Sequence, residues 1–136
     1  MITWEQYFGA KPHTDEQGAF ATNLLFRVNM LLDEARAAGA YHDAIDPDTG
    51  SQISGSRGGA GDGGFRLPTA TTGATKSAHK EARAVDVFDP QGHLDAWLTD
   101  QTLEKYGLYR EAPQSTYGWT HLTTRAPSSG RRTFEV

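Results

Sequence analysis

Apolar residues recur at steps of three and four between residues 20 and 35, which is the clearest pattern in the chain. This spacing places the apolar side chains on one face of an α-helix. Thr14 and Gln17 form a capping box where the pattern starts, and Gly39 suits the end of a helix. We therefore predict a long helix with a core-facing stripe made of Phe20, Leu24, Leu25, Val28, Leu31, Leu32 and Ala35.

Two further helices are predicted on similar grounds. Thr3 and Gln6 repeat the capping-box pattern and favour a short helix over residues 3–9. Residues 93–105 have the apolar spacing of one moderate helix, which Gly107 brings to an end.

Short segments rich in β-branched and aromatic residues predict strands at 52–57, 82–88, 108–109, 117–124 and 131–136. Turn residues at 46–50 and 89–92 separate some of these segments, and the Gly- and Thr-rich stretch 58–75 predicts a surface loop. The order of elements is typical of an α+β fold, in which helices pack on one side of a small antiparallel sheet. A length of 136 residues suits a single domain, 1–136.

The overall charge and the absence of cysteine limit the possible functions. A net charge of −4 argues against nucleic-acid binding, because affinity for phosphates comes from Lys and Arg. Without cysteine, the chain forms no disulfide, and any metal ligand must be His, Asp, Glu or backbone oxygen. No window approaches 18 apolar residues and the first residues do not resemble a secretory signal, so we expect neither a membrane segment nor a signal peptide.

Three residues form a candidate metal site: His79, Asp86 and His121. Two imidazoles and one carboxylate leave a fourth position on a zinc ion open, which is how hydrolytic zinc sites are built. The alternative interpretation is a surface histidine, a turn aspartate and a hydrogen-bonded core histidine. The spacing of His79 and Asp86 alone does not decide between the two interpretations, because such pairs occur by chance.

Four short motifs occur along the chain: Ser54-x-x-Arg57, Ser77-x-His79, Ala84-x-Asp86 and Trp119-x-His121. Together they resemble the signature of the zinc D-Ala-D-Ala carboxypeptidases and related peptidoglycan endopeptidases. These enzymes share the hedgehog-like DD-peptidase fold and include many phage endolysins. The likeness extends from about residue 23 to the C-terminus.

The resemblance implies a zinc ion held by His79, Asp86 and His121. It also implies that Arg57 binds a carboxylate or carbonyl of the substrate, which its planar fork suits, and that Ser77 helps to shape the site. A structural ion pair is the other interpretation of Arg57.

The chain departs from the family pattern at two positions. Ala82 stands where many relatives have glycine. Gly118 stands where well-studied relatives have an acidic general base, three residues before the last histidine. Two acids near the motifs are candidates for this role, and we favour Glu111, in the expected loop before the strand of His121, over Glu81.

Trp119 is two residues before His121 and so shares its face of a strand, where it would wall the site or pack beside it. The expected function is a monomeric zinc peptidase that cleaves peptidoglycan stem peptides, of the D,D-carboxypeptidase or L-Ala-D-Glu endopeptidase type. It would be made in the bacterial cytoplasm and act at the wall after release, as an endolysin does, or from a virion. Two alternatives stay open: a non-catalytic wall-binding or virion module on the same fold, and a metal hydrolase of another small amide.

Overall fold

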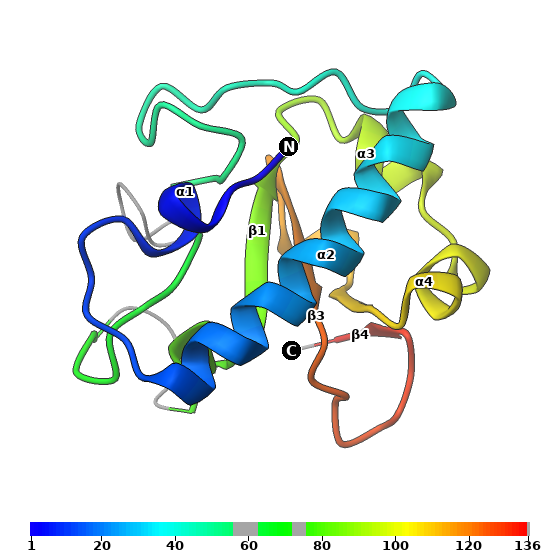
Figure 1. Cartoon of the computed structure of the whole chain (residues 1–136). Coiled ribbons are helices and arrows are strands. Elements are labelled where there is room, and N and C mark those ends of the chain that lie inside the picture. Colours follow the sequence, from blue (N-terminus) through cyan, green and yellow to red (C-terminus); the bar gives the residue numbers. More distant parts are fainter. Residues whose placement is uncertain (56–62, 72–75, 136) are drawn as a thin grey trace.

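The structure is a computed structural model, which describes residues 1–55, 63–71 and 76–135. Helices come first along the chain, and a small sheet with short interposed helices follows (Figure 1). The elements are α1 (Trp4–Phe8), α2 (Asp15–Ala37), η1 (Ala78–Glu81), β1 (Ala84–Phe88), α3 (His93–Trp97), α4 (Asp100–Tyr106), β2 (Tyr109–Glu111), η2 (Pro113–Ser115), β3 (Trp119–Thr123) and β4 (Thr133–Phe134). The α+β class predicted from the sequence is confirmed.

Both predicted capping boxes form. At the start of α2, the Thr14 hydroxyl accepts a hydrogen bond from the Gln17 backbone N–H at 3.1 Å, and the Gln17 side chain accepts one from the Thr14 N–H at 2.8 Å. Six of the seven residues of the predicted stripe are buried, and Phe20 packs partly buried against them. The hydrophobic spacing therefore identified the longest helix and the face that it buries.

The sheet has the strand order β1-β3-β2-β4. Strands β1, β3 and β2 are antiparallel neighbours, whereas β4 pairs with β2 in parallel. The prediction of an antiparallel sheet is thus correct for three strands and wrong for the fourth. The chain reaches β4 through the segment that follows β3, and this return path delivers the last strand in the direction of β2 (Figure 1).

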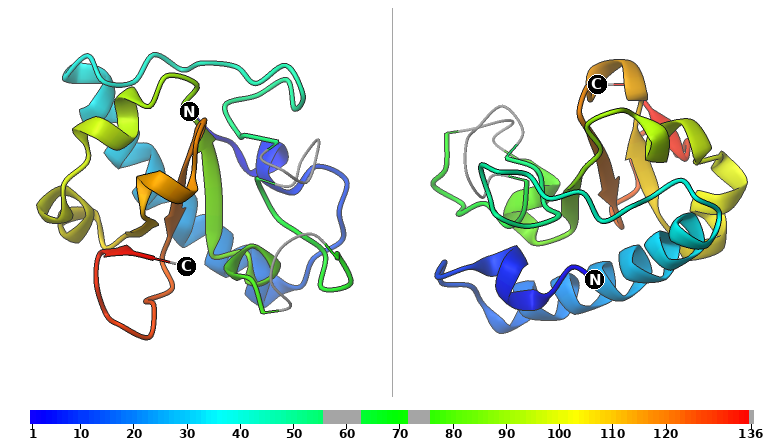
Figure 2. Two further views of the ribbon diagram at one scale, coloured as in Figure 1. Left: turned by 180° about the vertical axis from the view of Figure 1, so that it is seen from behind. Right: turned by 90° about the horizontal axis from the view of Figure 1, so that it is seen from above.

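Helix α2 crosses one face of the sheet diagonally (Figure 1), and the view from above shows α1 and α2 as a layer beside the strands (Figure 2). Val85, Val87 and Leu122 belong to the same buried core as the apolar stripe of α2. Side chains alternate between the two faces of a strand. Asp86 and His121 therefore lie on the face of the sheet opposite to α2.

Three predictions about local structure need correction. The stretch 58–75 was predicted to be a surface loop, but Phe65 and Arg66, in its described part, are buried. The helix expected over residues 93–105 is split into α3 and α4, because Leu98 is extended (φ −63°, ψ 138°) and the Thr99 hydroxyl caps a new helix by accepting from the Thr102 N–H. The strand expected over residues 52–57 is reduced, in its described part, to an isolated bridge between Ile53 and Val87. In the described part of the chain, no helix is long and apolar enough to cross a membrane.

Candidate metal centre

The three predicted ligands converge. His79 comes from η1, Asp86 from β1 and His121 from β3, and one ligand atom of each lies within 4.8 Å of the others. Asp86 and His121 are directly opposite each other in the antiparallel register of β1 and β3. Side-chain exposure is 3% for His79, 3% for Asp86 and 14% for His121, so the cluster is closed to solvent except beside His121. These residues could hold a metal ion.

The local sequence explains how His79 reaches β1. The Ser77 hydroxyl accepts a hydrogen bond from the His79 backbone N–H at 3.2 Å and starts the short helix η1. Ala82 ends η1 in the left-handed region (φ 61°, ψ 35°), a conformation that glycine adopts more readily than alanine. Ala82, where the family that the sequence resembles often has glycine, is therefore the residue that turns the chain into β1.

A backbone carbonyl orients the His79 ring. Its Nδ1–H donates to the Gly64 carbonyl at 2.9 Å, and its Nε2 lies 3.3 Å from Asp86 Oδ1. Such a bond from the far ring nitrogen is the usual support of a histidine ligand, because it fixes the tautomer that exposes Nε2. Burial lowers the pKa of His79 more than the neighbouring Asp86 raises it. His79 is therefore neutral at pH 7, as a metal ligand must be.

Asp86 links the two imidazoles. Its Oδ1 accepts a hydrogen bond from His121 Nδ1 at 2.8 Å and faces His79 Nε2. Burial alone would raise the pKa of the Asp86 carboxyl, but the two histidines outweigh it and hold that pKa well below its usual range. Asp86 is thus a buried carboxylate that stays ionised.

One of the distances between donor atoms matches the edge of a tetrahedral zinc site. Ligands at about 2.0–2.2 Å from zinc stand roughly 3.3–3.6 Å apart in a tetrahedron, and the distance from His79 Nε2 to Asp86 Oδ1 is 3.3 Å. The 2.8 Å hydrogen bond of His121 is shorter than this edge. If Nδ1 is the ligand atom of His121, this bond must open and its proton must leave when an ion binds.

Glu111 lies in β2, not in a loop as the sequence suggested. Its neighbour Arg110 is directly opposite Leu122 in β3, so Glu111 lies beside His121 and on the same face of the sheet. On its other side Glu111 is paired with Phe134, whose ring stands perpendicular to the His121 ring with 6.1 Å between the centroids. Glu111 and the Phe134 ring thus border the candidate metal cluster.

Of the three other predicted site residues, two lie in the described part of the chain. Trp119 is the first residue of β3, where it is half-buried and lies on the same face of the sheet as His121. Glu81 pairs with Arg125 at 3.0 Å and with Arg83 at 3.9 Å. Arg57 lies outside the described residues.

The sequence reasoning missed Arg66, Phe134 and the carbonyl of Gly64. Arg66 is 8% exposed, and one of its guanidinium nitrogens lies 3.8 Å from Asp86 Oδ2. The signal that could have found Arg66 is weak: one arginine in a Gly-rich loop, 13 residues before the first histidine ligand. No sequence feature indicated Phe134, because its approach to His121 depends on the parallel pairing of β4 with β2.

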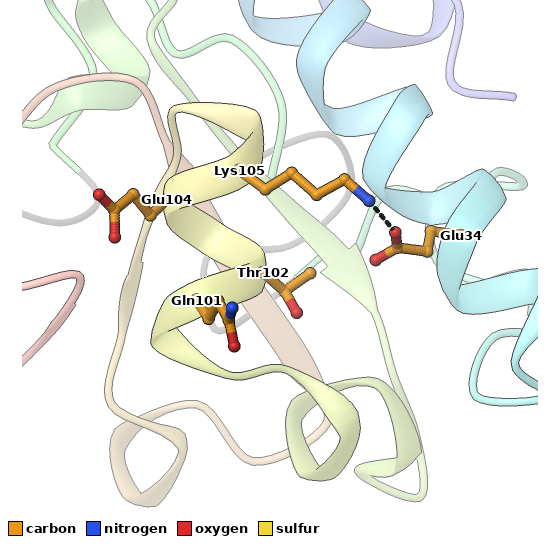
Figure 3. A pocket seen from close by; sticks show the side chains of 5 residues that line it. All are labelled: Glu34, Gln101, Thr102, Glu104 and Lys105. Carbon is orange, nitrogen blue, oxygen red and sulfur yellow. Dashed lines mark hydrogen bonds and ion pairs between the residues drawn. The ribbon is translucent and has the colours of Figure 1, made fainter.

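A separate open groove of about 560 Å³ lies between α2 and α4 (Figure 3). The Lys105 ammonium reaches across it to the Glu34 carboxylate. This exposed ion pair contributes little to stability, because both charges remain in contact with water. The groove shares no residue with the metal cluster and is lined by Glu34, Gln101, Thr102, Glu104 and Lys105.

Comparison with known proteins adds no relative: no family model matches the chain, and neither does any of the curated proteins or solved structures compared with it.

Proposed function

We propose that the protein is a zinc-dependent peptidase that cleaves peptidoglycan stem peptides. The observation that carries the proposal is the convergence of two imidazoles and one carboxylate, from three separate elements, within 4.8 Å. The backbone support of His79 and the ionised state of Asp86 favour a site built for a cation. Zinc is favoured over magnesium or calcium because imidazole ligands suit it, whereas those ions prefer oxygen.

When bound, zinc supplies a Lewis acid that polarises the scissile carbonyl and activates water. In this proposal the Glu111 carboxylate accepts a proton from the attacking water as the C–O bond forms. It then donates that proton to the amide nitrogen as the C–N bond breaks, so that a carboxylate and a free amine leave. Glu111 is supported by its position beside His121 on the metal-binding face.

The backbone at Gly118 favours a general base at another position than in the family that the sequence resembles. Gly118 has φ 93°, a conformation that L side chains rarely adopt. An acid placed there would strain the turn that leads into β3. A general base supplied from β2 avoids this strain.

The substrate class comes from the resemblance of the four motifs. Stem peptides carry free carboxylates, and Arg57 is proposed to bind one of them. The D-Ala-D-Ala bond and the L-Ala-D-Glu bond are both candidates. We propose action at the bacterial wall by a monomer, either as a phage endolysin after release or as part of a virion.

The second candidate function is a non-catalytic wall-binding or virion module on the same fold. The observation that favours it is again Gly118, because the chain has no acid at the place where the family that it resembles has one. Such a module would retain zinc and bind stem peptides without cleaving them.

Metal analysis combined with mass spectrometry of digested sacculi separates the two functions. We expect wild type to hold one zinc ion and to release peptide fragments, and His121→Ala to lose both properties. Glu111→Gln should keep its zinc and lose cleavage by about 10²–10⁴-fold. Glu104→Gln, at an exposed position of α4, is the matched control and should behave like wild type.

Wild-type protein that holds zinc and releases no fragments would favour the non-catalytic module. Glu111→Gln protein that cleaves as fast as wild type would exclude Glu111 as the general base. Wild-type protein that binds no zinc would overturn the metal site itself.

A further inference from the structure

A buried arginine stands next to the ligand set. Arg66 is 8% exposed, and its backbone N–H donates to the His79 carbonyl at 3.2 Å. Its guanidinium lies 3.8 Å from Asp86 Oδ2. The two Asp86 oxygens therefore face different partners, because Oδ1 faces the imidazoles of His79 and His121 and Oδ2 faces Arg66.

This arrangement balances charge inside the metal-free protein. A buried carboxylate is costly unless a cation or several donors compensate it. Arg66 supplies a permanent positive charge, because a guanidinium does not lose its proton in proteins. Arg66 thus offsets the negative charge of the Asp86 carboxylate before any ion arrives.

The same positive charge acts against a second cation. A divalent ion bound through Asp86 Oδ1 would share this carboxylate with the guanidinium, and both side chains are buried. The repulsion between the two cations is weakly screened there. Arg66 therefore has opposite effects on the two states of the site: it stabilises the empty site and destabilises the filled one.

We propose that Arg66 is a positioning residue that holds Asp86 in its ligand orientation in the metal-free protein and lowers the affinity of the site for the divalent ion. This inference rests on the proposed zinc site. It goes beyond the ligand set by naming the residue that sets how tightly the ion is held. Functionally, Arg66 keeps the site formed when it is empty, so that an ion enters a prepared site.

The chain offers a close control. Arg110 is also 8% exposed and also pairs with a buried carboxylate, at 3.3 Å from Asp95 Oδ1. Arg110 is opposite Leu122 in the register and so lies on the other face of the sheet from His121. Arg66→Met and Arg110→Met thus remove the same kind of buried ion pair, at the metal cluster in one case and away from it in the other.

The experiment measures the melting temperature of metal-free protein and the affinity for zinc, by competition with a chromophoric chelator. Both methionine variants should melt at lower temperature than wild type when metal-free. Arg66→Met should bind zinc more tightly than wild type, by roughly tenfold or more. Arg110→Met should bind zinc within about threefold of wild type. Arg66→Lys keeps the positive charge and should also stay within about threefold.

Unchanged or weaker zinc binding by Arg66→Met would overturn the inference and leave the zinc site standing. If Arg66→Met does not fold, Arg66→Lys decides: affinity near that of wild type supports the role of the charge, and a tenfold change contradicts it. Wild-type protein that binds no zinc would overturn the zinc site and this inference together. No step of the test depends on peptidase activity.

Discussion

Two buried aspartates, Asp86 and Asp89, lie three residues apart along the chain and have different surroundings. Asp89 accepts hydrogen bonds from the backbone N–H groups of Leu94 and Asp95, at 3.1 and 3.0 Å, and from the Thr120 hydroxyl at 3.2 Å. Both of its oxygens are thus occupied by fixed donors at the start of α3. Asp86 instead faces two imidazoles and a guanidinium.

The comparison shows what distinguishes a structural carboxylate from a candidate ligand. Backbone donors cannot leave Asp89 without unfolding α3, so its role is to hold the helix in place. The imidazoles around Asp86 can give up a proton and share a metal ion with it. Burial is similar for the two residues, at 2% for Asp86 and 6% for Asp89, so burial alone does not separate their roles.

The largest expected effects come from replacing the carboxylate of Asp86 or that of Asp89 by a neutral amide. Asp86→Asn should weaken zinc binding by about 100-fold or more, because an amide is a poor zinc ligand. Asp89→Asn should leave zinc binding unchanged and lower the free energy of unfolding by about 2 kcal/mol, since the new amide N–H₂ faces a backbone donor. Zinc titration and urea unfolding of both variants measure the two effects. Equal loss of zinc binding in both variants would contradict the comparison.

The next effect is on the pH dependence of stability. His79, beside Asp86, and Asp95, beside Asp89, should contribute to stability at opposite ends of the pH range. Burial lowers the pKa of His79, so the stability that its neutral form contributes is complete above the unfolded pKa of about 6.5 and is lost as the pH falls below it. Burial raises the pKa of Asp95, next to Asp89, to about 6. Asp95 therefore contributes most stability below the unfolded pKa of about 3.9, and this contribution is lost as the pH rises through 6.

Metal-free wild type and Asp95→Asn, unfolded by urea between pH 4 and 7, test this opposition. The stability of wild type relative to Asp95→Asn should fall as the pH rises through this range. Zinc binding should weaken as the pH falls in both proteins, because protons compete for the imidazoles. A stability difference that does not change with pH would contradict the raised pKa of Asp95.

A smaller effect is expected at Thr120, whose hydroxyl donates to Asp89 Oδ2 at 3.2 Å. Thr120→Val should lower the free energy of unfolding by about 1.5 kcal/mol, because the variant loses a hydrogen bond to a buried carboxylate. Zinc affinity should not change, although Thr120 is the immediate neighbour of His121 in β3. Weaker zinc binding in this variant would show that the two carboxylates are coupled through β3.

The smallest effect is expected at Ala82, at the turn that joins His79 to β1. Ala82→Gly relieves the left-handed backbone at φ 61° but loses a buried methyl group and adds freedom to the unfolded chain. These contributions nearly cancel, so the free energy of unfolding should change by less than about 1 kcal/mol. Ala82→Val should destabilise by more, because a β-branched residue is rarely left-handed. Thermal unfolding of the two variants compares them, and equal melting temperatures would contradict the argument.

The helices show which structural features local sequence patterns can predict. The stripe of α2 and the capping hydroxyls of Thr3 and Thr14 identified two helices, because capping and 3.6-residue spacing act within a few residues. The same reasoning wrongly predicted α3 and α4 as one helix, because the apolar spacing does not indicate the extended backbone of Leu98. The parallel pairing of β4 also escaped prediction, because strand direction depends on the path of the whole chain.

Local patterns in the chain were enough to predict His79, Asp86 and His121 as candidate ligands and α2 as a helix that buries an apolar face. The folded arrangement was needed to show that these three side chains meet, that Arg66 lies behind Asp86 and that Glu111 lies beside His121. The difference comes from the range of the interactions. Capping and periodicity act between neighbours along the chain, whereas strand register and the burial of charge depend on residues that are distant in sequence.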